Sequence, residues 1–366
     1  MTTPTRVLNF SAGPAVLPLP VLEEIQRDLV ALPGVGMSIL EVSHRSKAFE
    51  DILAKTEADI RALANIPANY KVLFLQGGAS TQFSMVPMNL LGAGQTADYI
   101  DCGSWADKAI KEAKKVGTVN VSGSSKADNY SHLPNSADLK FTPGAAYVHI
   151  TNNNTIEGTE YKTLPDVGGA PIVNDTSSDM FSRPIDIAKH GLIYAGAQKN
   201  LGPAGVTLVI IREDMLARAA AVQKTLPTML SYAVHAENTS MYNTPPTFSI
   251  YAVGLVVQWL QKNGGLPAML AVNERKAGKL YAEIDRTGFY RGTAKKEDRS
   301  LMNVTFRLST EDLEKKFVKE STAAGLDGLK GHRSVGGMRA SIYNAFPESG
   351  IDTLVAFMQE FERKNG

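Results

Sequence analysis

Seven short apolar runs, spaced along the first two-thirds of the chain, limit what this sequence can fold into more than any other feature. Several of them are continuous β-branched stretches, which is typical of strands buried on both faces of a sheet. Helix-like stretches alternate with the runs, and one precedes the first of them, after Ser46, where apolar residues recur at helical spacing from Phe49 to Leu63. The pattern predicts an α/β fold with a large, mostly parallel sheet of seven strands. The runs occupy 71–75, 97–101, 117–121, 146–150, 171–174, 192–194 and 206–211.

The pattern changes after about residue 264. Residues 300–309 alternate between apolar and polar side chains, and 338–343 form a second alternating run. A helix is expected to begin at Ser309, with Asp312 completing a capping box, and to end near Gly325. One-faced strands with helices on the other side indicate a smaller α+β domain. We therefore expect a large domain over 15–263 and a small one over 264–366, with 1–14 packing near the small domain.

Composition excludes several classes of protein. The chain has 366 residues, of which 43% are hydrophobic and 20% are charged, as in globular proteins. Its net charge of +1 argues against a nucleic-acid or membrane-surface partner. Cys102 is the only cysteine, which excludes intrachain disulfides, and the six histidines lack the spacing of a zinc helix. Without a secretory signal or a long apolar run, we expect a cytoplasmic protein with no metal.

Lys199 stands where a charged side chain is unusual. It closely follows the apolar run that ends at Gly196, and its neighbours are mainly small residues. The carboxyl ends of parallel strands are where open α/β sheets bind ligands. Desolvation there lowers the pKa of an amine and makes it a nucleophile that can form a Schiff base. The alternative is an ordinary lysine in a surface loop.

Asp175 ends the preceding apolar run, at the same expected edge of the sheet as Lys199. A carboxylate at that place can keep a pyridinium nitrogen protonated while the lysine holds an aldehyde. The alternative is a helix cap or a solvated turn, because Asp-Thr-Ser-Ser is common turn composition.

A glycine-containing loop at 76–82 follows the first apolar run and precedes a helical pattern. Such a loop can bring the N–H groups of a helix N-terminus to a phosphate, although a plain turn is equally compatible. It lacks the Gly-Lys-Ser/Thr of a nucleotide P-loop, and no Gly-x-Gly-x-x-Gly follows any run.

Aromatic and basic residues supply further candidates. Trp105 follows the second run and could stack on a flat heteroaromatic ring or simply belong to the core. Cys102 has no basic neighbour, so a small buried hydrophobe is the better interpretation. Arginine and histidine donors bind carboxylates and phosphates, although most arginines are only surface groups. The candidates of this kind are His44, Arg45, His332, Arg333 and Arg339.

In five motifs the chain resembles the phosphoserine aminotransferase family, fold-type I enzymes that depend on pyridoxal phosphate. The resemblance runs from 9–14 (Asn-Phe-Ser-Ala-Gly-Pro) to the C-terminus. Its most specific stretches are 43–46 (Ser-His-Arg-Ser), 74–79 (Phe-Leu-Gln-Gly-Gly-Ala), 194–205 (Tyr-Ala-Gly-Ala-Gln-Lys-Asn-Leu-Gly-Pro-Ala-Gly), 241–247 (Met-Tyr-Asn-Thr-Pro-Pro-Thr) and 331–341 (Gly-His-Arg-Ser-Val-Gly-Gly-Met-Arg-Ala-Ser).

The resemblance implies a role for each matching position. Lys199 would form the Schiff base with the cofactor, Asp175 would pair with the pyridine nitrogen, and Trp105 would stack on the ring. The cofactor phosphate and the ring hydroxyl would be held by Ala79, Ser80, Gln198 and Thr155, together with Asn243 and Thr244 of a neighbouring subunit in a homodimer. The substrate would be bound through its α-carboxylate by Arg339 and through its phosphate or distal carboxylate by His44, Arg45, His332 and Arg333. Ser80 departs from members that carry an arginine there, so at this position only hydroxyl donors are available.

The implied reaction is ping-pong transamination between O-phospho-L-serine and α-ketoglutarate, giving phosphohydroxypyruvate and L-glutamate in serine biosynthesis. Some members also use phosphohydroxythreonine, in pyridoxal phosphate biosynthesis. The alternatives are another fold-type I enzyme, such as an alanine–glyoxylate type aminotransferase or a cysteine desulfurase, and a non-catalytic binding protein of the same fold. An NAD-dependent oxidoreductase is disfavoured by the missing glycine motif.

Overall fold

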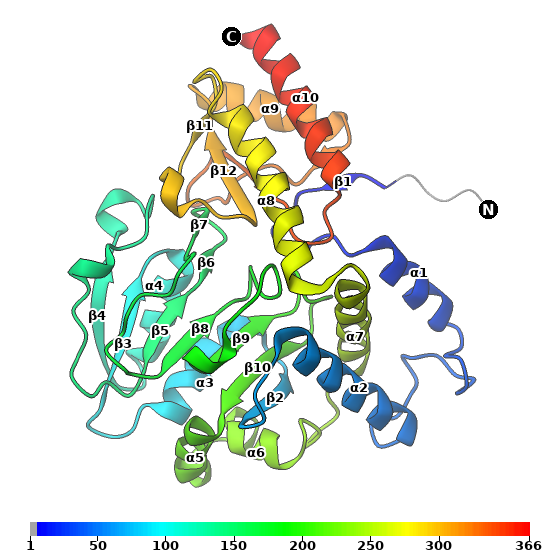
Figure 1. The fold of residues 1–366 in the computed structure, drawn as a ribbon, viewed down its shortest axis with the longest axis vertical. Coiled ribbons are helices and arrows are strands. Elements are labelled where there is room, and N and C mark those ends of the chain that lie inside the picture. The colour runs from blue at the N-terminus through cyan, green and yellow to red at the C-terminus, as the bar shows by residue number, and fades with distance from the viewer. Residues whose placement is uncertain (1–5) are drawn as a thin grey trace.

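The computed structural model describes residues 6–366 and is built around one seven-stranded sheet (Figure 1). The strand order is β2-β10-β9-β8-β5-β3-β4. Only β10 runs antiparallel to its neighbours, so the predicted seven-stranded, mostly parallel sheet is confirmed. The strands are β2 (Tyr70–Leu75), β3 (Thr96–Asp101), β4 (Thr118–Ser124), β5 (Val148–Thr151), β8 (Ile172–Asp175), β9 (His190–Gly196) and β10 (Thr207–Arg212).

Alternate residues of the central strands enter two different cores. Ile193 and Ala195 of β9 join a cluster with α2 (Lys47–Ala64) and α7 (Thr247–Lys262). Leu192 and Tyr194 join another cluster with the helices of the opposite face. Because successive strand residues point to opposite sides, the sheet is buried on both faces, as its β-branched runs predict. The helices of that second face are α3 (Gly78–Leu90), α4 (Ser104–Ala113), α5 (Glu213–Val222) and α6 (Tyr232–Glu237).

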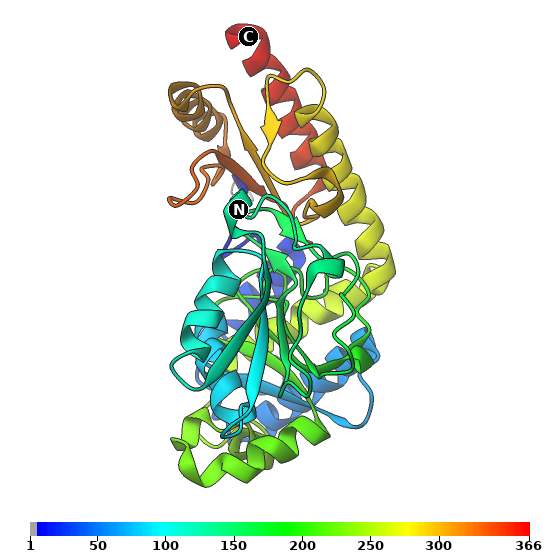
Figure 2. The same ribbon diagram turned by 90° about the vertical axis from the view of Figure 1, so that its left-hand side faces the viewer.

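The C-terminal part has its own apolar cluster around a three-stranded antiparallel sheet. Figures 1 and 2 show its helices α8 and α10 side by side. The sheet comprises β11 (Arg291–Gly292), β12 (Asn303–Arg307) and β14 (Met338–Ser341), and the helices are α8 (Gly265–Ile284), α9 (Glu311–Ala323) and α10 (Glu348–Asn365).

The N-terminal segment joins this C-terminal part. Strand β1 (Leu8–Asn9) pairs with β13 (Leu326–Asp327), and Phe10 belongs to the same apolar cluster. Helix α1 (Leu19–Asp28) then packs against α7. Residues 1–5 of the segment predicted to pack here lie outside the described residues, and the division between domains at 263 and 264 stays a prediction.

The predicted helix cap is confirmed for α2 and is wrong by one residue for α9. The Ser46 hydroxyl accepts the Phe49 N–H at the start of α2, as expected. At α9 the predicted cap Ser309 is wrong, since Thr310 accepts the Leu313 N–H at 3.3 Å. Two adjacent hydroxyl residues are both able to cap, and the point at which the chain leaves β12 selects the second.

Strand β12 is buried on both faces, which corrects the expectation of a one-faced strand. Val304 and Phe306 face the apolar cluster of the C-terminal part. Asn303 and Thr305 face the segment 153–158, which follows β5 of the large sheet. Asn153 donates to Asn303 Oδ1 at 2.8 Å, and Thr305 donates to the Glu157 carbonyl at 2.9 Å. Gly158, with φ of +79°, permits this approach, because a Cβ there would collide with Thr305. The polar face is therefore a contact between the two parts of the chain.

No helix within residues 6–366 combines the length and the apolar character needed to cross a membrane.

Candidate active site

A cavity of about 310 Å³ lies at the carboxyl ends of the parallel strands and brings most of the predicted site residues together. Its wall also includes Ala12 and Gly13 of the N-terminal segment, so the start of the chain closes one side. The predicted residues on its wall are Ala79, Ser80, Trp105, Thr155, Asp175, Gln198, Lys199, His332 and Arg339.

Lys199 lies in the loop after β9 with 8% of its surface exposed. Its Nζ donates a hydrogen bond to Thr155 Oγ1 at 2.7 Å. Burial lowers the pKa of Lys199 to about 8; the negative charge of Asp175 opposes this shift and the positive charge of Arg339 adds to it. Near neutral pH the neutral form, which a nucleophile requires, is therefore populated far more than at the ordinary pKa of 10.5.

Asp175 is the last residue of β8, in register with Thr151 of β5 and Tyr194 of β9. It is buried, and its Oδ1 accepts the Ser177 N–H at 2.9 Å. Burial raises the pKa of Asp175, while the bonds from Ser177 and the charge of Lys199 oppose that shift. A buried carboxylate with a cationic neighbour can hold a further positive group, such as a protonated ring nitrogen.

The N-terminus of α3 supplies the end of the cavity suited to an anion. Gly77 precedes it with φ of +91°, and a Cβ there would collide with the Thr81 side chain. Ala79 and Ser80 lie in the first turn, where backbone N–H groups have no partner within the helix. Gln198 reaches the cavity from the loop that carries Lys199. The Gln198 carbonyl accepts the Ala15 N–H at 2.9 Å. A phosphate would meet donors here without a P-loop.

Trp105 is held by a contact that the sequence does not reveal. The residue before it, Ser104, donates both its N–H and its hydroxyl to Glu157 Oε1, at 2.9 and 2.5 Å. Glu157 is 6% exposed, and burial raises its pKa. Glu157 therefore fixes the start of α4, and with it the indole that lines the cavity.

Arg339 joins this cavity to a second one of about 570 Å³. It lies on β14, and its Nη1 donates to the Thr155 carbonyl at 3.3 Å. The two cavities share Ile156, His332 and Arg339, and the second extends between β12, β14 and the segment 128–131. A substrate can thus place one anionic group at Arg339 and extend into the larger space.

Three buried polar atoms of residues that line this cavity lack a hydrogen-bond partner in the part of the chain that the structure describes. Trp105 Nε1, Thr151 Oγ1 and Arg339 Nε have no hydrogen-bond partner among residues 6–366. Buried polar groups are nearly always paired in folded proteins, so these atoms fit a polar ligand bound between them. Ser177, Ser178 and Asn153 also line the wall, and the only sequence signal for them was their place beside strand ends.

Five predicted residues do not line the cavity of the same chain. His44 and Arg45 precede α2, and Arg45 donates to His44 Nε2 at 3.3 Å. Asn243 and Thr244 are exposed before α7, and the Thr244 carbonyl accepts a bond from Gln76 at 3.3 Å. The fifth, Arg333, is exposed in the turn after His332.

Two further observations bear on the chemistry. Cys102 is fully buried, and burial raises the pKa of its thiol to about 12, in agreement with a structural role. Among residues 6–366, no three His, Cys, Asp or Glu side chains are grouped so that they could hold a metal ion.

Comparison with known proteins assigns the family. The family model for aminotransferase class-V matches residues 7–354. The phosphoserine aminotransferase of Desulfatibacillum aliphaticivorans is 58% identical over 363 residues, covering 99% of both chains. The solved phosphoserine aminotransferase of Bacillus circulans subsp. alkalophilus is 52% identical, with a TM-score of 0.95 and 99% of both chains covered. A PLP-bound phosphoserine aminotransferase from Trichomonas vaginalis is 41% identical, with a TM-score of 0.92, covering 97% of this chain and all of that one. The chain belongs to the phosphoserine aminotransferase family within the class-V aminotransferases.

Proposed function

We propose that this protein transfers the amino group of O-phospho-L-serine to α-ketoglutarate with pyridoxal phosphate as cofactor. The observation that carries the proposal is the buried Lys199 amine, whose lowered pKa and neighbour Asp175 are set in one cavity. The identity of 58% with a phosphoserine aminotransferase over nearly the whole chain supports this substrate. An alanine–glyoxylate type aminotransferase or a non-catalytic protein of this fold is not favoured by that identity.

The residues of the cavity fit the cofactor. When bound, pyridoxal phosphate supplies an aldehyde for the substrate amine and a ring that accepts electrons. Asp175 would hold a proton at the ring nitrogen, and Trp105 would pack against the ring. Ala79 and Ser80 in the first turn of α3, with Gln198 from the loop after β9, would hold the phosphate, and Thr155 would hold the ring hydroxyl.

Lys199 does the proton transfer. Its amine would take the proton from the substrate α-carbon and hold it for return at the cofactor, which requires a neutral amine at the start. Arg339 orients the substrate by its α-carboxylate, and its bond to the Thr155 carbonyl keeps it close to the lysine. Release of the first keto acid before the second binds gives ping-pong kinetics.

The distal anion of the substrate distinguishes phosphoserine from small amino acids. His332 lines the cavity of about 570 Å³, and the exposed Arg333 follows it in the chain. A phosphate carries nearly two charges for such donors. His44 and Arg45 complete this site when they come from a second subunit. Phosphohydroxythreonine carries the same groups, and a coupled assay of both amino donors measures the preference.

We propose a homodimer in which each subunit lends His44, Arg45, Asn243 and Thr244 to the other's site. All four lie outside the cavity of their own chain, and their segments also expose Met37, Leu40 and Tyr242. Sedimentation should give twice the mass of the chain. Mixed dimers of Lys199→Ala, which is inactive alone, and Arg45→Ala, which is weakened alone, should be more active with phosphoserine than either variant, because one of the two sites then carries neither change. A cytoplasmic location stays a prediction, which cell fractionation can check.

The function is tested by Lys199→Ala. We expect the purified variant to fold and to lose transamination of phosphoserine. Loss of acid–base catalysis alone typically costs roughly 10²–10⁴-fold, and the loss here should be far larger because the cofactor can no longer be attached. More than a trace of turnover without added amine would contradict the role of Lys199. If the parent enzyme turned over alanine but not phosphoserine, the proposed substrate would be wrong.

A further inference from the structure

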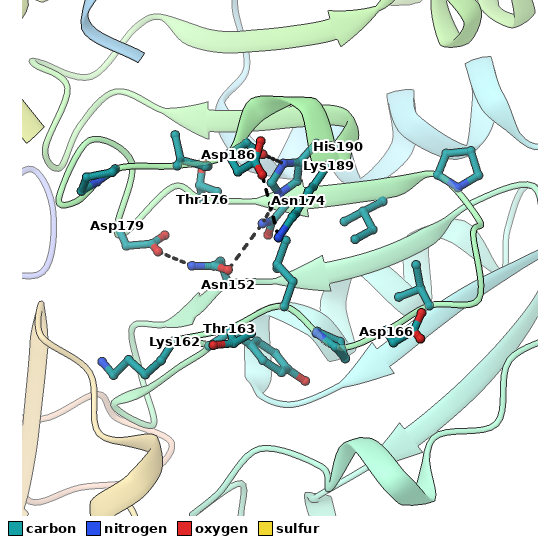
Figure 3. A pocket seen from close by; sticks show the side chains of 18 of the residues that line it. Asn152, Lys162, Thr163, Asp166, Asn174, Thr176, Asp179, Asp186, Lys189 and His190 are labelled. Atoms are coloured by element: carbon teal, nitrogen blue, oxygen red, sulfur yellow. Dashed lines mark hydrogen bonds and ion pairs between the residues drawn. The ribbon is translucent and has the colours of Figure 1, made fainter. Parts of the chain in front are cut away.

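A larger cavity, of about 700 Å³, lies against the strand that carries Asp175, on its other side (Figure 3). Asp175 and Ser177 line the candidate active site, whereas Asn174 and Thr176 line this cavity. Because successive side chains of an extended chain point to opposite sides, the two cavities lie back to back. They have no lining residue in common.

Asn174 interrupts an apolar row at the floor of this cavity. In the sheet register it stands between Ile150 of β5 and Ile193 of β9, which belong to two separate apolar clusters. A buried asparagine at such a place costs free energy unless its amide is hydrogen-bonded. Its bonds therefore decide what the cavity can hold.

The orientation of the Asn174 amide follows from His190. His190 Nδ1 lies 2.9 Å from the Asp186 carbonyl, which can only accept, so this nitrogen carries the proton. Burial lowers the pKa of His190 to about 4, so the ring is neutral and its Nε2 is an acceptor. The Asn174 NH₂ group donates to that nitrogen at 3.2 Å and to Asn152 Oδ1 at 3.4 Å. The oxygen of Asn174 is left without a partner among residues 6–366.

Asp179 ends the same polar chain with a second free oxygen. Asn152 donates to Asp179 Oδ2, and Arg183 lies 3.8 Å from that oxygen. Asp179 Oδ1 has no partner within the described chain. Asn174 is 1% exposed and Asp179 is 5% exposed, and both line the cavity. Figure 3 shows the chain of bonds from Asp179 through Asn152 to Asn174 and His190. The wall of the deep part thus holds two acceptors that are unpaired among residues 6–366, each with less than 1 Å² of accessible surface, which a donor group reaches when these side chains shift slightly.

The rim carries charges of both signs, with Asp166 and Asp186 beside Lys162, Lys189 and Arg212. Lys189 has 66% of its side chain exposed, and its amine is 3.8 Å from Asp186, too far for a hydrogen bond. Lys162, in contrast, is paired with Glu160 at 2.9 Å, and Arg212 is paired with Asp214 at 2.6 Å. Lys189 is therefore the rim cation best able to bind an anionic group.

We propose that this cavity is a binding site for a small free α-amino acid, separate from the active site. The ammonium group donates to Asn174 Oδ1 and Asp179 Oδ1, and the carboxylate is bound by Lys189. The volume lies within the range of ordinary small-molecule sites, and water fills the remainder. The inference uses no residue of the proposed catalytic site, so it stands or fails separately from the proposed function.

The test is calorimetric titration of the holoenzyme with glycine and with L-serine. The enzyme is first converted to its pyridoxamine phosphate form, which has no aldehyde to react with an amino acid. We expect saturable binding of one molecule per chain. Lys189→Ala and Asn174→Ala should each weaken binding by on the order of tenfold or more, because each removes a charged or buried partner. Lys224→Ala, an exposed lysine away from the cavity, is the matched control and should bind as the parent does.

Three results would overturn the proposal. The first is no saturable binding of either amino acid. The second is parental affinity in both Lys189→Ala and Asn174→Ala, which would place the amino acid elsewhere. The third is methylammonium or acetate binding as tightly as glycine, which would show that only one end of the cavity binds. Since Lys189 is exposed, its variant should fold even where Asn174→Ala does not.

Discussion

Thr155 holds both Lys199 and Arg339, by its hydroxyl and its carbonyl respectively. The Lys199 amine donates to Thr155 Oγ1 at 2.7 Å, and Arg339 Nη1 donates to Thr155 O at 3.3 Å. The proposed proton carrier and the proposed carboxylate ligand are thus anchored on one residue, although 140 positions separate them in the chain. Both are held by atoms of a single residue, which suits a substrate whose α-carbon must lie between them.

The lowered pKa of Lys199 predicts how the apoprotein takes up its cofactor. Only the neutral amine reacts, so the rate of combination with pyridoxal phosphate should rise about tenfold per pH unit below pH 8 and level off above it. Absorbance after stopped-flow mixing measures this rate, and Lys199→Ala should give no such change. A rise that continues to pH 10 would mean that the amine has its ordinary pKa.

The same shift has a consequence for stability. The pKa of Lys199 in the folded apoprotein is about 8, below the ordinary value of 10.5. Between these two values the unfolded chain binds more protons, so the contribution of Lys199 to the free energy of unfolding increases with pH across that window. Lys276, whose pKa burial lowers to about 7, contributes a rise of the same sign in any variant. Denaturant titration should therefore show a steeper increase in the apoprotein than in Lys199→Met.

Asp175→Asn should keep the cofactor bound but slow proton abstraction severely. A neutral amide cannot hold the ring nitrogen protonated, whereas the remaining contacts of the cavity are unchanged. The rate of the half-reaction with phosphoserine, followed by the cofactor's absorbance, measures the effect. A rate equal to the parent's would show that Asp175 does not act on the ring.

Two substitutions of Glu157 can show whether its hydrogen bonds or its charge support cofactor binding. Glu157→Ala removes the acceptor of both Ser104 bonds and should weaken pyridoxal phosphate binding by about tenfold, since the start of α4 and Trp105 are then loosened. Glu157→Gln retains an oxygen for those bonds and should bind the cofactor nearly as the parent does. Quenching of tryptophan fluorescence during titration of the apoprotein gives both affinities. Equal losses in the two variants would mean that the charge matters and not the bonds.

Arg45 and Arg333 should matter for phosphoserine and not for alanine. Each charge-assisted bond contributes roughly 1.5–3 kcal/mol when desolvated, so replacing either arginine by alanine should lower kcat/KM for phosphoserine by roughly one to two powers of ten. The low activity with alanine, which has no distal anion, should stay as it is. Equal losses with both substrates would mean that these arginines hold the fold or the cofactor.

Patterns local in the chain were enough to predict the large sheet and the centre of the site. All seven apolar runs became strands of one sheet. Burial on both faces demands continuous apolar sequence in the inner strands, whereas most of the edge strand β4 is exposed or half-buried. Lys199 and Asp175 could be singled out because one follows a strand and the other ends one, at carboxyl ends that share an edge. The Ser46 cap was equally local.

Contacts between distant segments were beyond the sequence. Nothing near Ser104 shows that Glu157, 53 positions later, binds it twice. The polar face of β12 looked solvent-exposed, yet Asn303 and Thr305 are buried, because the segment 153–158 offers them polar partners. Asn174, in the same way, is satisfied on one side by His190 and Asn152.

The division has a physical basis. The apolar pattern, the capping residues and the position of Lys199 depend on backbone geometry within a few residues, so the sequence by itself determined the sheet, its two buried faces and the reactive edge. Which polar atoms meet, which remain unpaired, and how far burial lowers the pKa of Lys199 depend on groups that only folding brings together. Those were decided by the tertiary structure alone.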